Sequence, residues 1–255
     1  MNKIIKYVIA DLLRSRTIMV YTLVLFALAI SVFSMEDNAE KGVASLLNII
    51  LFVVPLVSIV FSTVYLYNSA EFIELLVSQP LKRQTIWVSI FIGLAGTVSL
   101  AFLVGVGIPV ILYAFMPSGI VLVLCGMVLS MVFVSIAMWA AVRIRDKAKG
   151  IGLSILLWLY FALLFDALVL FVVFQFSDYP IENGMVAVSM LNPVDISRIL
   201  ILLQIDVSAM MGYTGAIFRN FFGTSMGMGI TILVMLLWIV LPLGFATRYF
   251  KRKDL

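Results

Sequence analysis

Six long apolar runs dominate this chain and limit what it can fold into. A bilayer crossing needs about 20 consecutive apolar residues in an α-helix, and only 12% of the residues here are charged, against about a quarter in soluble domains. The runs therefore predict an all-α integral membrane protein with six transmembrane helices in a single domain, residues 1–255. The predicted spans are about 17–34, 43–67, 86–115, 120–142, 151–176 and 223–249.

The basic residues predict how these helices are oriented. Of the 17 Lys and Arg residues, all except Lys41, Arg198 and Arg219 lie near the two termini or in the loops after the second and fourth runs. Short cytoplasmic loops carry an excess of Lys and Arg. We therefore expect a bacterial inner-membrane protein with both termini in the cytoplasm. Its net charge of +4 would meet anionic membrane lipids, and we expect no nucleic acid as a partner.

Missing residue types weigh against several classes of enzyme. The chain has no His, which is the commonest metal ligand and a frequent general base, so it has neither an HExxH metal site nor a Ser-His-Asp triad. It also lacks a GxxxxGK[ST] loop for nucleotide phosphates. We expect no catalysis and no cofactor in this chain, with ATP and Mg²⁺ bound by a partner ATPase subunit if transport is ATP-driven. A membrane-embedded enzyme is the alternative, but it would need several polar residues inside the runs, where Asp166 stands almost alone.

Two short segments beside the runs are predicted to be amphipathic helices. Residues 1–16 place apolar side chains at helical spacing among basic ones, as in a helix at the cytoplasmic membrane interface. Residues 71–83 begin with acids, continue with apolar residues that share a face, and end in Pro and two bases. Such a cytoplasmic helix can dock into the groove of a partner. The alternatives are a simple juxtamembrane anchor and an ordinary loop helix.

The segment 71–83 resembles the coupling-helix region of ABC type-2 permeases. In such permeases two membrane subunits pair, each resting this helix on a cytoplasmic ATPase, and closure of the ATPases alters the membrane pathway. The resemblance implies the same arrangement here, with residues 1–16 as the elbow helix that leads into the first span. The residues assigned to ATPase coupling are Glu71, Phe72, Glu74, Leu75, Leu76, Pro80, Lys82 and Arg83.

A single acid, Asp166, lies inside the fifth run. An ionised side chain in the middle of a span costs at least about 2.5–3.5 kcal/mol. No Lys, Arg or His lies deep in any run, so the sequence shows no ion-pair partner. Asp166 is therefore either a protonated group that hydrogen-bonds a neighbouring helix or a participant in the transport path or in coupling.

The long segment 177–223 separates the last two runs, and loops of this length are commonly functional. Within it, Asn192 is a predicted N-cap, Pro193 fits the first helical position, and Asp195 stands at the acidic position of a capping box. Arg198 can pair with Asp195 three residues earlier. We expect a helix with one apolar face at the periplasmic membrane surface, where it would face partners.

The second half of the chain carries a more specific resemblance. It contains Phe165-Asp166, Leu191-Asn192-Pro193-x-Asp195-Ile196-x-Arg198 and Ser208-Ala209-Met210. These motifs are similar to those of the NosY type of permease, which belongs to the ABC transporter that matures nitrous oxide reductase in denitrification. The match covers about residues 143–211.

This resemblance implies three partners: a second copy of the chain, a cytoplasmic ATPase and a periplasmic β-helical copper-handling protein. The implied outcome is assembly of the copper sites of nitrous oxide reductase, with copper or a sulfur species as conceivable cargo. The alternative is an ABC type-2 permease that exports a lipid, a peptide or a small toxic compound. Neither the cargo nor the direction of movement follows from the residues.

The methionines provide only weak metal candidates. Met226 and Met228 form a Met-x-Met pair on the outer side, and thioethers suit Cu(I). Met is also an adaptable gap-filler in apolar helices, and neither His nor Cys accompanies this pair. We therefore expect no metal site.

Overall fold

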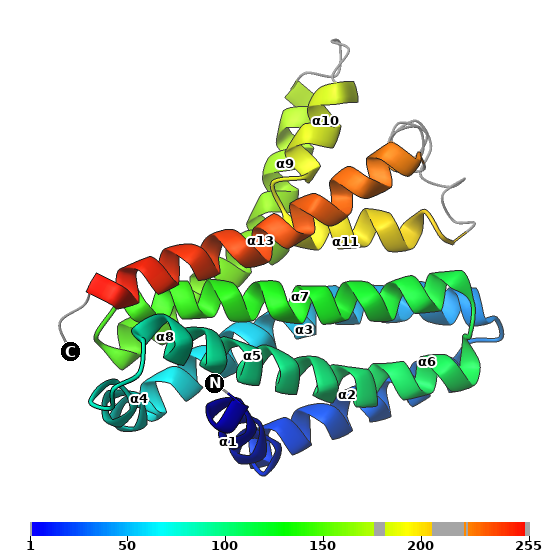
Figure 1. Cartoon of the computed structure of the whole chain (residues 1–255). Coiled ribbons are helices and arrows are strands. Elements are labelled where there is room, and N and C mark those ends of the chain that lie inside the picture. The colour runs from blue at the N-terminus through cyan, green and yellow to red at the C-terminus, as the bar shows by residue number, and fades with distance from the viewer. Residues whose placement is uncertain (1, 176–181, 206–221, 223, 253–255) are drawn as a thin grey trace.

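The structure, a computed structural model, describes residues 2–175, 182–205, 222 and 224–252 (Figure 1). Every regular element in these residues is a helix. In chain order they are α1 (Asn2–Leu13), α2 (Arg16–Met35), α3 (Ala39–Asn68), α4 (Ala70–Val77), α5 (Arg83–Phe102), η1 (Leu103–Gly107), α6 (Ile108–Tyr113), α7 (Pro117–Arg143), α8 (Lys147–Leu159), η2 (Tyr160–Leu164), α9 (Phe165–Gln175), α10 (Glu182–Ser189), α11 (Pro193–Leu202) and α13 (Ser225–Arg252).

Six helices in the described part of the chain are long and apolar enough to cross a membrane, which confirms the predicted all-α multi-pass fold. Their ends agree with the predicted ends to within about one helical turn. The predicted last residue of span five and first residue of span six lie outside the described residues. The spans are Arg16–Met35, Ala39–Asn68, Arg83–Tyr113, Pro117–Arg143, Lys147–Gln175 and Met226–Arg252.

The fourth span, α7, forms the centre of the bundle. It packs against α3, α5, α11 and α13 (Figure 1), and much of its surface is buried small residues, such as Ala137 and Ala140. Gly126 brings α7 close to α5, because a Cβ at this position would overlap the ring of Phe102. Helices in a membrane associate largely through such close packing. The other spans are therefore arranged around α7.

Two spans contain a π-helical turn. In η1 the N–H of Ile108 donates to the carbonyl of Leu103, and in η2 the N–H of Phe165 donates to the carbonyl of Tyr160. A hydrogen bond to the fifth preceding residue displaces the usual pairing by one position, and such turns are frequent at functional sites. The turn in η2 lies in the middle of span five, where it determines which backbone carbonyl is available to a neighbouring segment.

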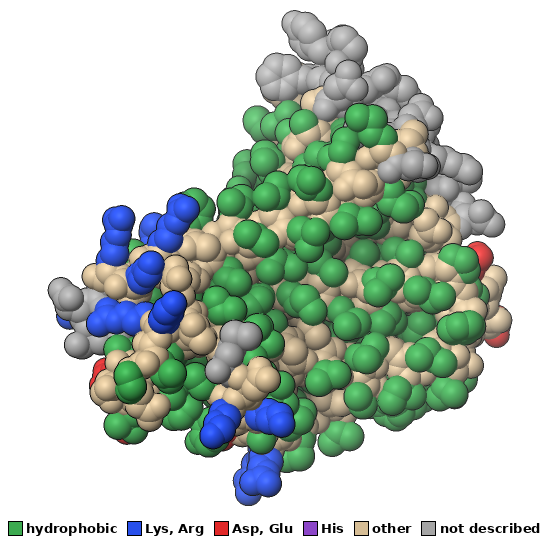
Figure 2. Space-filling view, viewed as in Figure 1, with side chains coloured by type: hydrophobic (Ala, Val, Ile, Leu, Met, Phe, Trp, Pro, Cys, Tyr) green, Lys and Arg blue, Asp and Glu red, His purple; other side chains and the backbone are tan. Residues whose placement is uncertain are grey.

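Charged side chains gather at opposite ends of the bundle (Figure 2). One end, called the basic end here, contains α1, α4, the start of α8 and the C-terminal end of α13 (Figure 1). Lys and Arg side chains cluster there together with a few acidic ones, whereas the charged side chains visible at the opposite end are acidic (Figure 2). The predicted charge asymmetry is therefore present in three dimensions.

The helix α11 does not lie on the outer surface, and that prediction was wrong. It runs alongside the spans, packed against α7 and α3, with α13 beside it (Figure 1). Val194, Ile196 and Ile201 are at most 1% exposed. These apolar residues surround the helix, whereas a surface helix carries a single apolar stripe. The motif from Asn192 to Arg198 is thus largely packed inside the subunit and does not form the expected partner-facing surface.

Candidate functional site

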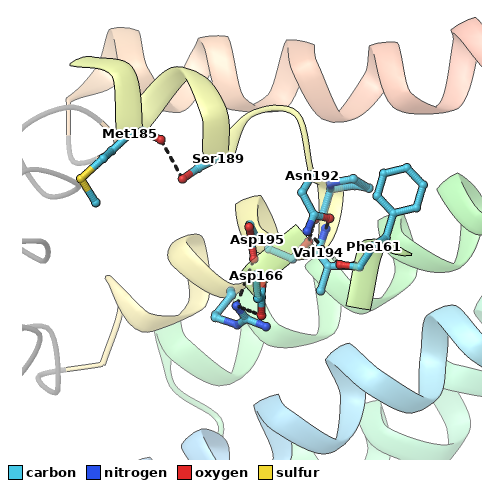
Figure 3. A network of polar contacts seen from close by, with 10 residues as sticks. Phe161, Asp166, Met185, Ser189, Asn192, Val194 and Asp195 are labelled. Carbon is cyan, nitrogen blue, oxygen red and sulfur yellow. Dashed lines mark hydrogen bonds and ion pairs between the residues drawn. The ribbon is translucent and has the colours of Figure 1, made fainter. Parts of the chain in front are cut away.

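Asn192 joins the start of α11 to the middle of span five (Figure 3). Its side-chain oxygen accepts a hydrogen bond from the N–H of Val194 at 3.0 Å, so it is the N-cap that the sequence predicted. Its Nδ2 atom donates to the carbonyl of Phe161 at 2.9 Å. The π-turn makes this possible, because the N–H of Phe165 is occupied by Tyr160. Both ends of the buried amide are therefore used, as buried polar groups require.

Arg198 bridges two carboxyl groups from different elements. Its Nη1 atom lies 2.8 Å from Oδ2 of Asp166 in α9 and 3.0 Å from Oδ1 of Asp195 in α11. The predicted pair of Asp195 and Arg198 is confirmed. The prediction that Asp166 has no ion-pair partner was wrong, because Arg198 was assigned to an outer loop, whereas α11 folds back along the bundle. A signal was available: the helix that carries Arg198 is apolar on nearly all sides, so its cation needs a buried acid.

The cluster contains two acids for one base. The Asp195 side chain is 10% exposed, whereas those of Asp166 and Arg198 are about a third exposed. Burial, followed by the hydrogen bond and the charge of Asp166, raises the pKa of Asp195 to about 7, although Arg198 opposes this shift. A hydrogen bond between two carboxyl groups requires a proton on one of them. The Asp195 carboxyl therefore keeps its proton to a higher pH than an exposed carboxyl does.

Asp195 does not complete the predicted capping box. The backbone N–H of Asn192 donates to the carbonyl of Ser189 at 3.3 Å, and the carboxyl of Asp195 faces Arg198. Asn192 thus binds α11 to span five through a neutral contact, and Arg198 does so through an ion pair. We call Asn192, Asp195, Arg198 and Asp166 the α11 clamp.

The predicted coupling segment forms α4 at the basic end (Figure 1). Ile73 and Leu76 are buried against the bundle, whereas Leu75 is 65% exposed, and the two acids that precede it in the helix, Glu71 and Glu74, are exposed. The predicted shared face of Phe72, Leu75 and Leu76 is therefore divided. One apolar side of this helix is therefore buried, and its outer side presents Leu75 beside two acids.

Further contacts tie α4 to its surroundings. The ring of Phe72 stacks on Tyr7 of α1, with ring centroids 4.8 Å apart. Pro80 and Lys82 lie exposed between α4 and α5. Arg83, at the start of α5, donates from Nη1 to the carbonyl of Lys251 at 3.4 Å, near the end of α13.

The start of span five is attached beside α4 as well. Lys147 donates from Nζ to Oδ1 of Asn68 at 2.7 Å, and Asn68 is the last residue of α3, immediately before the turn into α4. The hydroxyl of Tyr67 donates to the carbonyl of Ile144 at 3.0 Å. The ends of spans two, three, five and six therefore meet around the predicted coupling segment.

Met226 and Met228 are exposed near the start of α13. Residues two apart on a helix do not face each other, so these two thioethers do not converge on one metal ion. Within the described residues there is also no group of three or more His, Cys, Asp or Glu side chains that could hold a metal. The expected partner-binding part of the segment 177–223 includes residues 206–221, which lie outside the described residues.

Comparisons with known proteins place these features in a family. The family of ABC-2 transporter proteins matches residues 4–255. The chain is 24% identical to the probable ABC transporter permease protein NosY of Stutzerimonas stutzeri, over 96% of this chain and 95% of that protein. It is 25% identical to the protein of the same name from Pseudomonas aeruginosa, over 80% of this chain and 82% of that protein. These matches confirm the resemblance to NosY-type permeases. Of the motifs that carry this resemblance, Ser208-Ala209-Met210 lies outside the residues that the structure describes. The chain therefore belongs to the ABC-2 transporter family, whose members are membrane permease subunits of ABC transporters.

Proposed function

We propose that this permease supports the maturation of the copper sites of nitrous oxide reductase. It would couple ATP hydrolysis by a cytoplasmic ATPase to periplasmic partners or to transport of a copper or sulfur species. Similarity to two NosY permeases supports this context. The observation that carries the coupling role is α4, whose exposed Leu75 lies beside two exposed acids on a helix that is fixed to the bundle.

In this proposal the basic end faces the cytoplasm, consistent with the distribution of Lys and Arg in membrane proteins. Leu75 inserts into an apolar groove of the ATPase, while Glu71 and Glu74 meet basic residues at its rim. Because Ile73 and Leu76 are buried and Phe72 stacks on Tyr7, α4 is held by its inner side. A force on Leu75 is therefore transmitted to the bundle and does not simply bend a loop.

Span five provides a physical route from α4 to the α11 clamp. Its first residue, Lys147, is bonded to Asn68 beside α4, and farther along, Phe161 and Asp166 bind Asn192 and Arg198. We infer that movement of span five forms or breaks the contacts of the α11 clamp. This change would reposition the outer segment that meets a periplasmic β-helical protein. Two copies of the permease, each with an ATPase, would form the transporter. Coupling between distant sites requires a structural element that can adopt two arrangements. We assign that role to the α11 clamp, with its contacts to span five either formed or broken.

The coupling proposal is tested with Leu75→Asp in the native complex. A charged side chain cannot enter an apolar groove without a partner, so purification through a tag on this chain should recover much less ATPase. Leu13→Asp is the matched control, since Leu13 is an exposed Leu on the neighbouring helix α1. Equal recovery of the ATPase with both variants and the wild type would show that α4 is not the docking element.

The biological context is tested separately by deleting the gene in a denitrifying host. We expect nitrous oxide reductase protein at normal abundance but with its copper content reduced, and restoration by the wild-type gene. A fully copper-loaded reductase in the deletion strain would reject this role while leaving the permease assignment intact. Copper analysis of the purified reductase distinguishes these outcomes.

A further inference from the structure

A second feature of the bundle is an apolar slot between spans five and six. Its walls come from α7, from α8 with η2, from the turn between α10 and α11, and from α13. Its volume is about 610 Å³, which is within the range of small-molecule sites. Four aromatic rings line it: Trp139, Phe161, Trp238 and Phe245. We call this cavity the aromatic slot.

The charge that lines the aromatic slot lies at one end, which we call its mouth. Arg143 is its only charged lining residue in the described part of the chain. The guanidinium lies 4.7 Å from the centroid of the Trp139 ring at the basic end. At the inner end, Trp238 packs edge-on against Phe161, with ring centroids 5.3 Å apart, and its Nε1 donates to the carbonyl of Met190 at 3.3 Å. The slot thus extends from the basic end to the middle of span five.

The position of the slot defines the kind of molecule that reaches it. Most of its lining residues belong to spans four, five and six, between the basic end and the middle of span five, so hydrocarbon chains of the bilayer lie beside it. Basic pockets between spans are typical binding sites for anionic lipid headgroups.

We propose that the aromatic slot binds an anionic phospholipid from the leaflet at the basic end. One acyl chain lies among the four aromatic rings, and the headgroup phosphate contacts Arg143. Charge complementarity favours this occupant over a purely apolar helix face of a second copy, which would leave the cation at the mouth without an anion. The proposal is independent of the cargo and of the role in reductase maturation.

Lipid contact is measured by tryptophan quenching in the full-length protein reconstituted into bilayers. Trp87 and Trp158, which do not line the slot, are replaced by Phe, so that Trp139 and Trp238 are the reporters. Phosphatidylglycerol or phosphatidylcholine carries brominated acyl chains at equal mole fraction. We expect brominated phosphatidylglycerol to occupy the slot about fivefold more than phosphatidylcholine, which corresponds to about 1 kcal/mol. Arg143→Gln should abolish this preference.

Two controls make the result specific. Arg252→Gln removes an exposed cation from the end of α13 and should preserve the preference. A single-Trp protein that keeps Trp158, which does not line the slot, should show no preference. Equal quenching of Trp139 and Trp238 by both lipids, a preference that survives Arg143→Gln, or no quenching by either lipid because a second copy covers the slot would each overturn the proposal.

A second measurement uses protein with all its tryptophans, so that its result does not depend on correct folding of the reporter variants. Native mass spectrometry of the otherwise unmodified protein should detect retained phosphatidylglycerol in the wild type and in Arg252→Gln, and its loss in Arg143→Gln. Equal retention in all three proteins would contradict the proposed contact with Arg143.

Discussion

Replacement of Arg198 by Gln should weaken the attachment of α11 to span five. The guanidinium contacts Asp166 at 2.8 Å and Asp195 at 3.0 Å. A Gln side chain has no charge and cannot neutralise either acid. The two carboxyl groups then face each other without a cation, and their repulsion is largest at a pH where both are ionised. Asp166→Asn is a milder change, because Arg198 keeps one acid as its partner.

The size of the effect follows from the exposure of the pair. A hydrogen bond to a charged group contributes about 1.5–3 kcal/mol, and solvent screening lowers this for groups that are about a third exposed. We therefore expect Arg198→Gln, which loses both contacts, to cost roughly 2 kcal/mol, and Asp166→Asn about 1 kcal/mol or less. In a chain of this length, 1 kcal/mol shifts Tm by about 2–4 °C. The expected decreases are thus about 4–8 °C and at most about 4 °C.

Thermal unfolding of the purified protein at pH 8, followed by intrinsic fluorescence in a fixed lipid and detergent mixture, measures these shifts. Arg248→Gln, which removes an exposed Arg at the basic end, should change Tm little. The triple variant Asp166→Asn, Asp195→Asn, Arg198→Gln should recover part of the loss, because no buried charge remains without a partner. The reasoning is refuted if Arg198→Gln is as stable as Asp166→Asn, since the clamp would then not depend on its cation.

Three further predictions follow from other parts of the structure. Because the pKa of Asp195 is raised to about 7 in the folded protein, its contribution to stability is greatest below about pH 4 and is lost as the pH rises through 7; Asp195→Asn should flatten this part of a Tm against pH curve. In a background without the native cysteine, Leu81→Cys and Met35→Cys should react with impermeant thiol reagents from opposite sides of the membrane. Gly126→Ala should lower stability by about 1–3 kcal/mol through overpacking, whereas Gly152→Ala, with open space around it, should not; equal Tm values would contradict this.

Local sequence patterns determined the membrane architecture. An apolar run of sufficient length forms a spanning helix almost regardless of its neighbours, because a backbone in lipid must satisfy its own hydrogen bonds. The six spans and the charge asymmetry were therefore predictable. So was the N-cap at Asn192, since its oxygen needs only the N–H of Val194 two residues later.

Only the tertiary structure decided which polar groups meet. Asp166 and Arg198 are brought together because α11 turns inward along α7, and the π-turn in span five makes the Phe161 carbonyl available to Asn192. The division of α4 into a buried side with Leu76 and an exposed Leu75 also depends on the helices packed beneath it. Helical periodicity reports which residues share a side of one helix, but partners on different helices are chosen by packing. For this reason the sequence predicted the pair of Asp195 and Arg198 within α11 and not the contacts that this helix makes with span five.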